Sequence, residues 1–63
     1  MVGTSFGETI RQARLARGWT QADLGEKAGV SRPTIARVEA NNEVTTSTIS
    51  RIAAALGLTL ELR

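Results

Sequence analysis

The stretch QADLGEKAGVSRPTIARVEA, residues 21–40, decides the fold of this chain. Its ninth residue is Gly29, which suits a turn with a positive φ angle. Its fifth residue is Gly25, which is small enough to lie where two helices cross closely. The fourth, eighth, tenth, fifteenth and eighteenth residues are apolar and can bury the angle between two helices: Leu24, Ala28, Val30, Ile35 and Val38. The pattern predicts two short helices joined by a tight turn.

Capping residues mark where these two helices begin. Thr20 precedes the first helix as its N-cap, and Asp23 stands at the third helical position. Ser31 is the N-cap of the second helix, whose first turn tolerates Pro33 because a missing backbone N–H costs little there. The small, turn-forming, apolar and capping residues together predict a helix-turn-helix motif within residues 20–40.

Two further helices flank the motif. Ser5 and Glu8 have the spacing of a capping box, and Gly18 suits the left-handed position that ends a helix. After a loop over residues 41–45, apolar residues recur with helical spacing at Ile49, Ile52, Ala53 and Leu56. The expected helices cover residues 5–17, 21–28, 31–40, and 46 or 47 to 56.

The last six residues, 58–63, follow a different pattern. Apolar and polar residues alternate there, which is typical of a strand, and the apolar positions are Leu58, Leu60 and Leu62. A lone strand needs a partner, and no other segment of the chain resembles one, so the three leucines are expected to pair with a second copy in a dimer. Two alternatives are a fifth, frayed helical turn and the start of a further C-terminal domain.

Composition limits the chain to one domain, residues 1–63, and excludes several classes of function. The 63 residues include no Cys and no His, and the net charge is +2. Disulfides and Cys/His zinc sites are therefore excluded. The sequence also shows no pairing of a nucleophile with a base that would indicate an enzyme. We expect no cofactor and no metal. Because neither a membrane span nor a signal peptide is recognisable, we expect a cytoplasmic protein.

The stretch IRQARLARGWTQADLGEKAGVSRPTIARVEANN and the following ISRIAAALG resemble the phage-repressor (Cro/cI-like, or XRE) helix-turn-helix family. The residues that carry the resemblance are Arg14, Gly18 to Gln21, Leu24, Gly29 to Ser31, Thr34, Ile35 and Glu39. The resemblance implies an all-α, compact, lambda-repressor-like domain of four to five helices. It also implies a protein, phage-encoded or associated with the bacterial nucleoid, that binds double-stranded DNA, usually as a dimer, with the second motif helix in the major groove.

The outward residues of the second motif helix are the candidate base contacts. Arginine commonly binds guanine through two hydrogen bonds, and threonine or proline can contact a thymine methyl group. The candidates for base contact are Arg32, Pro33, Thr34 and Arg37. The candidates for phosphate contact are Gln21, Ser31, Arg17, Asn41 and Asn42. Glu43, in the same loop, would repel phosphates.

Two conspicuous residues are expected to be structural. In the family that the chain resembles, the arginine at the position of Arg14 pairs with the glutamate that ends the second motif helix, here Glu39. The resemblance therefore implies an ion pair between two helices. Trp19 follows a helix end and is expected to pack on apolar side chains.

Three functions are consistent with these residues. The leading one is a transcriptional repressor that binds an inverted repeat as a homodimer, with its recognition helices about 34 Å apart. The loop and tail also resemble antitoxins of HipA-type kinase toxins, which would make a toxin the second partner. The third is a protein-interaction adaptor with the same fold.

Overall fold

The computed structural model describes residues 6–58, which form α1 (Phe6–Ala16), α2 (Gln21–Ala28), α3 (Arg32–Glu39) and α4 (Thr46–Ala55). Each of these helices begins and ends within one residue of the bounds predicted from the sequence. The predicted capping box at Ser5, and Leu60 and Leu62 of the tail, lie outside the described residues. No helix in the described part is long and apolar enough to cross a membrane.

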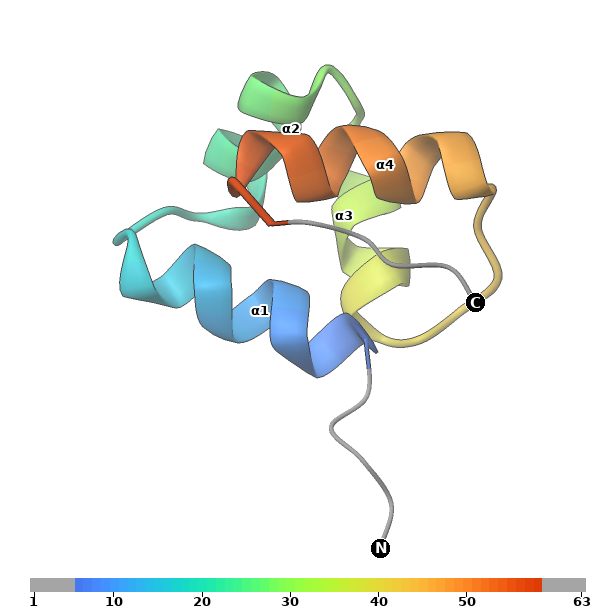
Figure 1. Cartoon of the computed structure of the whole chain (residues 1–63), viewed down its shortest axis with the longest axis horizontal. Helices are drawn as coiled ribbons and strands as arrows, with labels where there is room; N and C mark the ends of the chain where they lie inside the picture. The colour runs from blue at the N-terminus through green and yellow to red at the C-terminus, as the bar shows by residue number, and fades with distance from the viewer. Residues whose placement is uncertain (1–5, 59–63) are drawn as a thin grey trace, which may run out of the picture.

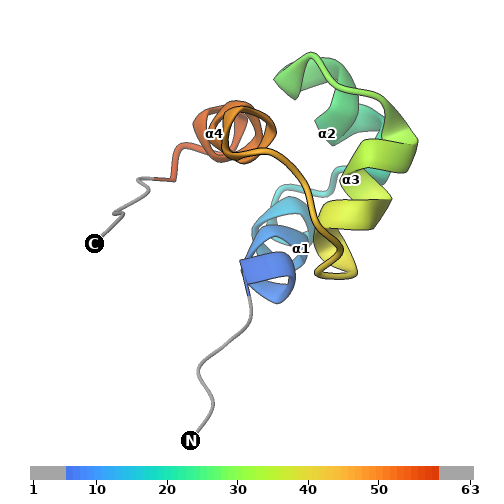
Figure 2. The ribbon, with the colours of Figure 1, turned by 90° about the vertical axis from the view of Figure 1, so that its right-hand side faces the viewer.

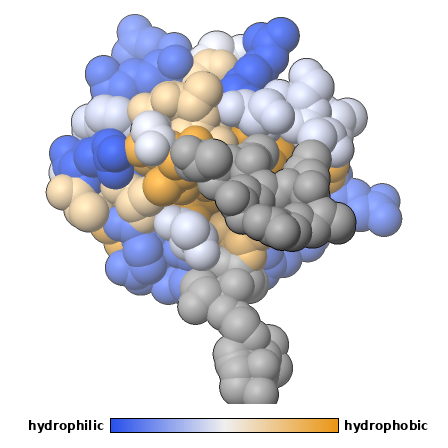
Figure 3. Space-filling model, in the orientation of Figure 1, coloured by the Kyte–Doolittle hydropathy of each residue, from blue (hydrophilic) through white to orange (hydrophobic). Residues whose placement is uncertain are grey.

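The helix-turn-helix pair packs on the other two helices in a crossed arrangement. α2 packs against α3, α3 also contacts α1, and α2 also contacts α4. Figure 1 shows α4 in front of α3, and the turned view in Figure 2 places α2 and α3 together on the side opposite α4. The face formed by α1 and α4 carries a group of apolar residues with hydrophilic residues around it (Figure 3). α3 therefore lies on the side of the molecule away from this apolar face.

One small core holds the helices together. Its largest fully buried side chains come from each helix and from the residue after α4: Ile10, Leu24, Ile35, Ile52 and Leu56. Full burial of such a side chain contributes about 1.5–3 kcal/mol. The apolar positions predicted from the motif lie in or beside this core, with Val30 half-buried. The tail residue Leu58 also packs against the core of its own chain.

Side-chain caps mark the starts of α2, α3 and α4, and those of α2 and α3 are the predicted ones. Thr20 and Asp23 form a complete capping box, in which the Thr20 hydroxyl accepts from the Asp23 N–H and the Asp23 carboxylate accepts from the Thr20 N–H. These hydrogen bonds lower the pKa of Asp23. The Ser31 hydroxyl caps α3 as predicted, and the Thr45 hydroxyl, which was not predicted as a cap, does the same for α4. Local sequence is therefore sufficient to explain where α2, α3 and α4 begin.

Candidate nucleic-acid interface

The angle between α2 and α3 is set by a close backbone approach. A Cβ atom added at Gly25 would lie 2.7 Å from the carbonyl oxygen of Val30, which is too close for any side chain. Gly29 adopts a φ of +74°, in the left-handed region that favours glycine. The sequence predicted a small residue at position 25 and a glycine at position 29, and their geometry turns the start of α3 sharply away from α2.

α3 presents one apolar and one polar face. Ile35 and Val38 are buried against the core. Arg32, Pro33 and Arg37 are exposed, and within residues 6–58 neither arginine has a carboxylate partner in an ion pair. The structure therefore brings the candidate base-contacting residues together on the exposed side of one short helix.

The first turn of α3 is organised by the Ser31 hydroxyl. Its oxygen accepts a hydrogen bond from the Thr34 N–H at 3.3 Å, and the Ser31 and Thr34 hydroxyl groups lie 2.8 Å apart. Thr34 is half-buried, whereas Ser31 is exposed. The Ser31 side chain thus has a capping role in addition to its expected contact with phosphate.

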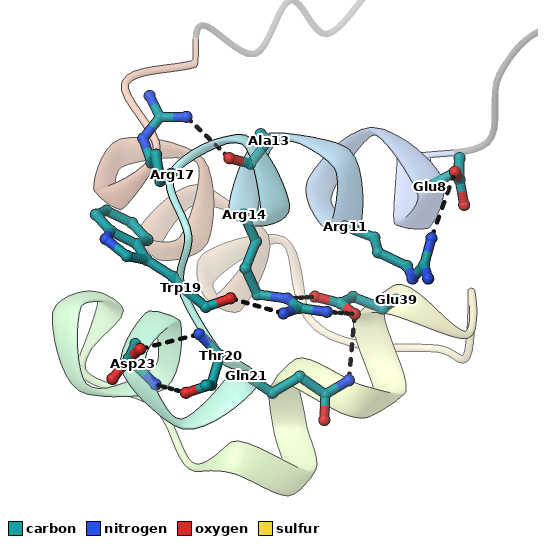
Figure 4. A network of polar contacts seen from close by, with 10 residues as sticks. All are labelled: Glu8, Arg11, Ala13, Arg14, Arg17, Trp19, Thr20, Gln21, Asp23 and Glu39. Atoms are coloured by element: carbon teal, nitrogen blue, oxygen red, sulfur yellow. Dashed lines mark hydrogen bonds and ion pairs between the residues drawn. The ribbon is translucent and has the colours of Figure 1, made fainter.

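A buried ion pair joins α1 to the end of α3 (Figure 4). Arg14 donates from Nε to Glu39 Oε2 at 2.7 Å and from Nη2 to Glu39 Oε1 at 3.1 Å. Its third nitrogen, Nη1, donates to the carbonyl oxygen of Trp19 at 2.8 Å. The hydrogen bond and charge of Glu39 raise the pKa of Arg14 against the opposing effect of burial. The pair that the family resemblance implied is therefore a two-bonded contact between α1 and α3.

Gln21, the first residue of α2, belongs to the same network. Its Nε2 donates to Glu39 Oε1 at 3.2 Å, and its side chain is half-buried. Figure 4 shows the Gln21 amide oxygen pointing away from Glu39. The candidate phosphate contact at the start of α2 is thus linked to the residue that ends α3.

The loop between α3 and α4 is held against the start of α1. Asn41 adopts a φ of +63°, and its Oδ1 accepts a hydrogen bond from the Gly7 N–H at 3.0 Å. A Cβ atom added at Gly7 would lie 2.5 Å from the carbonyl oxygen of Val38, so only glycine allows this approach. Asn42 is exposed beside Asn41. The role of Gly7 was not predicted from the sequence, although glycine is an unfavourable residue inside a helix and signals a special position.

Two cationic residues next to this network point in different directions. Arg37 donates to the carbonyl oxygen of Glu43 at 3.4 Å and stays near the α3–α4 loop. Arg17 donates to the carbonyl oxygen of Ala13 in α1 and to that of Leu56, at the carboxyl end of α4. Figure 4 shows Arg17 on the other side of α1 from Glu39. The structure thus separates Arg17 from the other candidate phosphate contacts.

Trp19 packs against the core and forms a platform for two cations. The Arg17 guanidinium lies 5.6 Å and the Lys27 ammonium 4.9 Å from its ring centroid, which are distances typical of cation–π contacts. Since Trp19 is half-buried and flanked in this way, its place in the fold is structural.

Comparisons with known proteins agree with this geometry. A helix-turn-helix family model matches residues 10–62. A point mutant of the restriction–modification controller protein C.Esp1396I is 29% identical, with a TM-score of 0.76, over 86% of this chain and 71% of that one. A chain of the HipA–HipB–O2–O3 complex is 28% identical, with a TM-score of 0.81, over 100% of this chain and 94% of that one.

A chain of the HipB–O1–O2 complex gives a similar result, with 28% identity, a TM-score of 0.80, and coverage of 100% of this chain and 97% of that one. No curated protein matches the chain. The family match spans most of the sequence, including both motif helices and the residues of the candidate interface. The chain belongs to the XRE-type helix-turn-helix family and is a DNA-binding transcriptional regulator.

Proposed function

We propose that this protein represses transcription by binding an inverted repeat in duplex DNA as a homodimer. The observation that carries the proposal is the exposed face of α3, where Arg32 and Arg37 lack carboxylate partners within the described residues. A helix of this kind fits the major groove, where arginine can donate two hydrogen bonds to guanine. The bound protein would occlude a promoter without any chemical step.

Residues around α3 would fix its position on the DNA backbone. The first turn of α2, with Gln21, and the first turn of α3, with Ser31, each direct N–H groups out of a helix start, and such groups bind phosphates. Asn41 and Asn42 can donate amide hydrogens from the α3–α4 loop. Arg17 points away from this side, so its contribution to phosphate binding would be the weakest of the set.

A dimer is favoured by the distribution of apolar residues. They gather on the α1 and α4 face, while α3 lies on the other side of the molecule (Figures 2 and 3). Two copies that meet through this apolar face would leave both α3 helices available for successive major grooves, about 34 Å apart. Leu60 and Leu62 of the tail would extend the same contact, whereas Leu58 also packs against the core of its own chain.

The test is selection of duplexes from a random DNA library at physiological salt. We expect enrichment of an inverted repeat whose half-sites lie about one helical turn apart. Sedimentation of the complex with the enriched duplex should then give two protein chains per site. A folded protein that enriches no sequence would contradict the proposal and favour an adaptor role.

An antitoxin is the second candidate function. It is supported by the similarity to a chain of the HipA–HipB–O2–O3 complex over 100% of this chain, including the tail. Such a protein would bind a HipA-like kinase and repress the operon that encodes both. Co-purification of the chain with the product of an adjacent kinase-like reading frame would support this role. A genome without such a frame beside the gene would refute it.

A further inference from the structure

Glu39 connects a buried ion pair to a residue at the expected DNA surface. Its Oε1 accepts two hydrogen bonds, one from Arg14 Nη2 at 3.1 Å and one from Gln21 Nε2 at 3.2 Å. The Glu39 side chain is only 6% exposed. The carboxylate is therefore nearly removed from solvent, yet it contacts the first residue of the helix that would approach the DNA backbone.

This contact determines which way the Gln21 amide faces. With Nε2 toward Glu39, a donor meets a carboxylate oxygen. If the amide were rotated by half a turn, Gln21 Oε1 would face that oxygen, and two acceptors would lie against each other, which is unfavourable. The observed orientation, with the amide oxygen directed away from Glu39 (Figure 4), is the one that the carboxylate selects. Nε2 keeps a second hydrogen for another acceptor.

Arg14 makes this arrangement compatible with DNA binding. A carboxylate so near the start of α2 would repel a phosphate if its charge were uncompensated. The two hydrogen bonds from Arg14 neutralise it locally, and the third anchors the guanidinium to the Trp19 carbonyl oxygen, two residues before Gln21. The same arginine thus fixes both the carboxylate and the backbone that leads into α2.

We propose that Glu39 is a positioning residue for DNA binding, which orients the Gln21 amide so that its second Nε2 hydrogen and the first-turn N–H groups of α2 address one phosphate. The inference rests on the proposed function and adds a residue that does not itself touch the DNA. It also assigns a functional consequence to the Arg14–Glu39 pair, in addition to its role in joining α1 to α3.

The sign of the change in DNA affinity tests the proposal. Glu39→Gln removes one negative charge, which by simple electrostatics would strengthen binding to a polyanion. We expect the opposite, a loss of about fivefold. An amide at position 39 has one acceptor oxygen in place of two, so it cannot keep all three hydrogen bonds from Arg14 and Gln21, and the net value of one hydrogen bond is about 1 kcal/mol. The matched control is Glu43→Gln, which removes the same charge from the α3–α4 loop and should leave the affinity unchanged or higher. Tighter binding by Glu39→Gln would overturn the proposal.

A double-mutant cycle separates positioning from a general structural effect. In a Gln21→Met background there is no amide to orient, so Glu39→Gln should change the affinity by less than about twofold, since the pairwise coupling has been removed. The same loss in both backgrounds would show that Glu39 acts only on the fold, and would overturn the proposal. Circular dichroism at the assay temperature establishes that each variant is folded.

A second route covers the case in which Glu39→Gln does not fold. The variant Arg14→Met with Glu39→Leu replaces the ion pair with apolar side chains, which proteins often tolerate, and leaves the net charge unchanged. It should also bind the selected duplex about fivefold more weakly, by the same hydrogen-bond argument. Affinity equal to that of the wild type would count against positioning by Glu39.

The outcomes distinguish this inference from the proposed function. A wild-type protein that selects no duplex contradicts the proposed function itself. A wild-type protein that binds its duplex no more tightly than Gln21→Met refutes the positioning role alone, because the amide would then make no contact worth orienting.

Discussion

Two arginines of this small domain, Arg14 on α1 and Arg37 on α3, show opposite environments. Arg14 is 8% exposed, and each of its nitrogens donates a hydrogen bond, to Glu39 or to the Trp19 carbonyl oxygen. Arg37 is exposed and, among residues 6–58, has one long hydrogen bond of 3.4 Å, to the Glu43 carbonyl oxygen. Every nitrogen of the first side chain is held by the protein, whereas the second keeps most of its donors for another molecule. Hydrogen bonding within the protein thus separates Arg14, which is structural, from Arg37, which we propose as a DNA contact.

The largest expected effect comes from breaking the ion pair between Arg14 and Glu39. Arg14→Met would leave Glu39 as a nearly buried charge without its partner, and we expect a loss of about 3–5 kcal/mol in the free energy of unfolding. Urea denaturation followed by circular dichroism measures this loss. Adding Glu39→Leu should restore most of the stability, because the uncompensated charge is then gone. A loss below about 1 kcal/mol, the range of exposed pairs, would mean that the pair behaves as a surface contact.

A substitution of the exposed Arg37 should give the reverse result, a small effect on stability and a clear effect on DNA recognition. Arg37→Ala is expected to change the free energy of unfolding by less than about 0.5 kcal/mol, as surface substitutions usually do. It should lower discrimination at one base pair of the half-site by about 1–3 kcal/mol. Competition between the selected duplex and single-base variants measures this. Equal weakening for all sequences would instead identify Arg37 as a phosphate contact, since such contacts carry no sequence information.

The capping box at the start of α2 sharpens the comparison, because it is exposed and yet architectural. Thr20→Ala removes the acceptor for the Asp23 N–H and should cost about 1 kcal/mol of unfolding free energy. Thr20→Ser keeps the hydroxyl and serves as the control. If both variants were as stable as the wild type, the hydrogen bonds of this box would have no net value, and exposure alone would explain the difference between the two arginines.

The smallest effect is a pH dependence from the same box. The pKa of Asp23 in the folded protein is lowered by its hydrogen bonds to Thr20, so its carboxylate stabilises the fold fully above the ordinary aspartate value of about 3.9. This contribution is lost as the pH falls through the lower, folded-state pKa. Thermal unfolding of wild type and Asp23→Asn between pH 6 and pH 2 should show a smaller pH dependence for the variant. Parallel curves would exclude this contribution.

Many features of the fold could be predicted because their signals are local. Thr20 and Ser31 cap the helix that follows each of them through groups within three residues. The glycine positions of the motif and its apolar spacing indicated how α2 and α3 cross, because sterics and burial allow few alternatives over so short a stretch. The resemblance to a known family, rather than periodicity, supplied the expectation that Arg14 and Glu39 pair.

The functional side chains were less predictable in their contacts than in their positions. The outward residues of α3 follow from helical periodicity once Ile35 and Val38 are assigned to the core. The sequence gives no indication that Arg17 would donate to the end of α4, or that Asn41 would accept from Gly7. These contacts depend on how α1 sits against the ends of α3 and α4, which no local pattern encodes.

The sequence by itself determined the helices, the turn between α2 and α3, and the face of α3 that stays in contact with solvent. Only the tertiary structure decided which polar groups meet across the chain. Gln21 reaches Glu39 over 18 residues, and Gly7 reaches Asn41 over 34. The physical reason is that capping and periodicity act over one or two turns, whereas a hydrogen bond between distant residues forms only after the core around Ile10, Leu24 and Ile35 has brought their helices together.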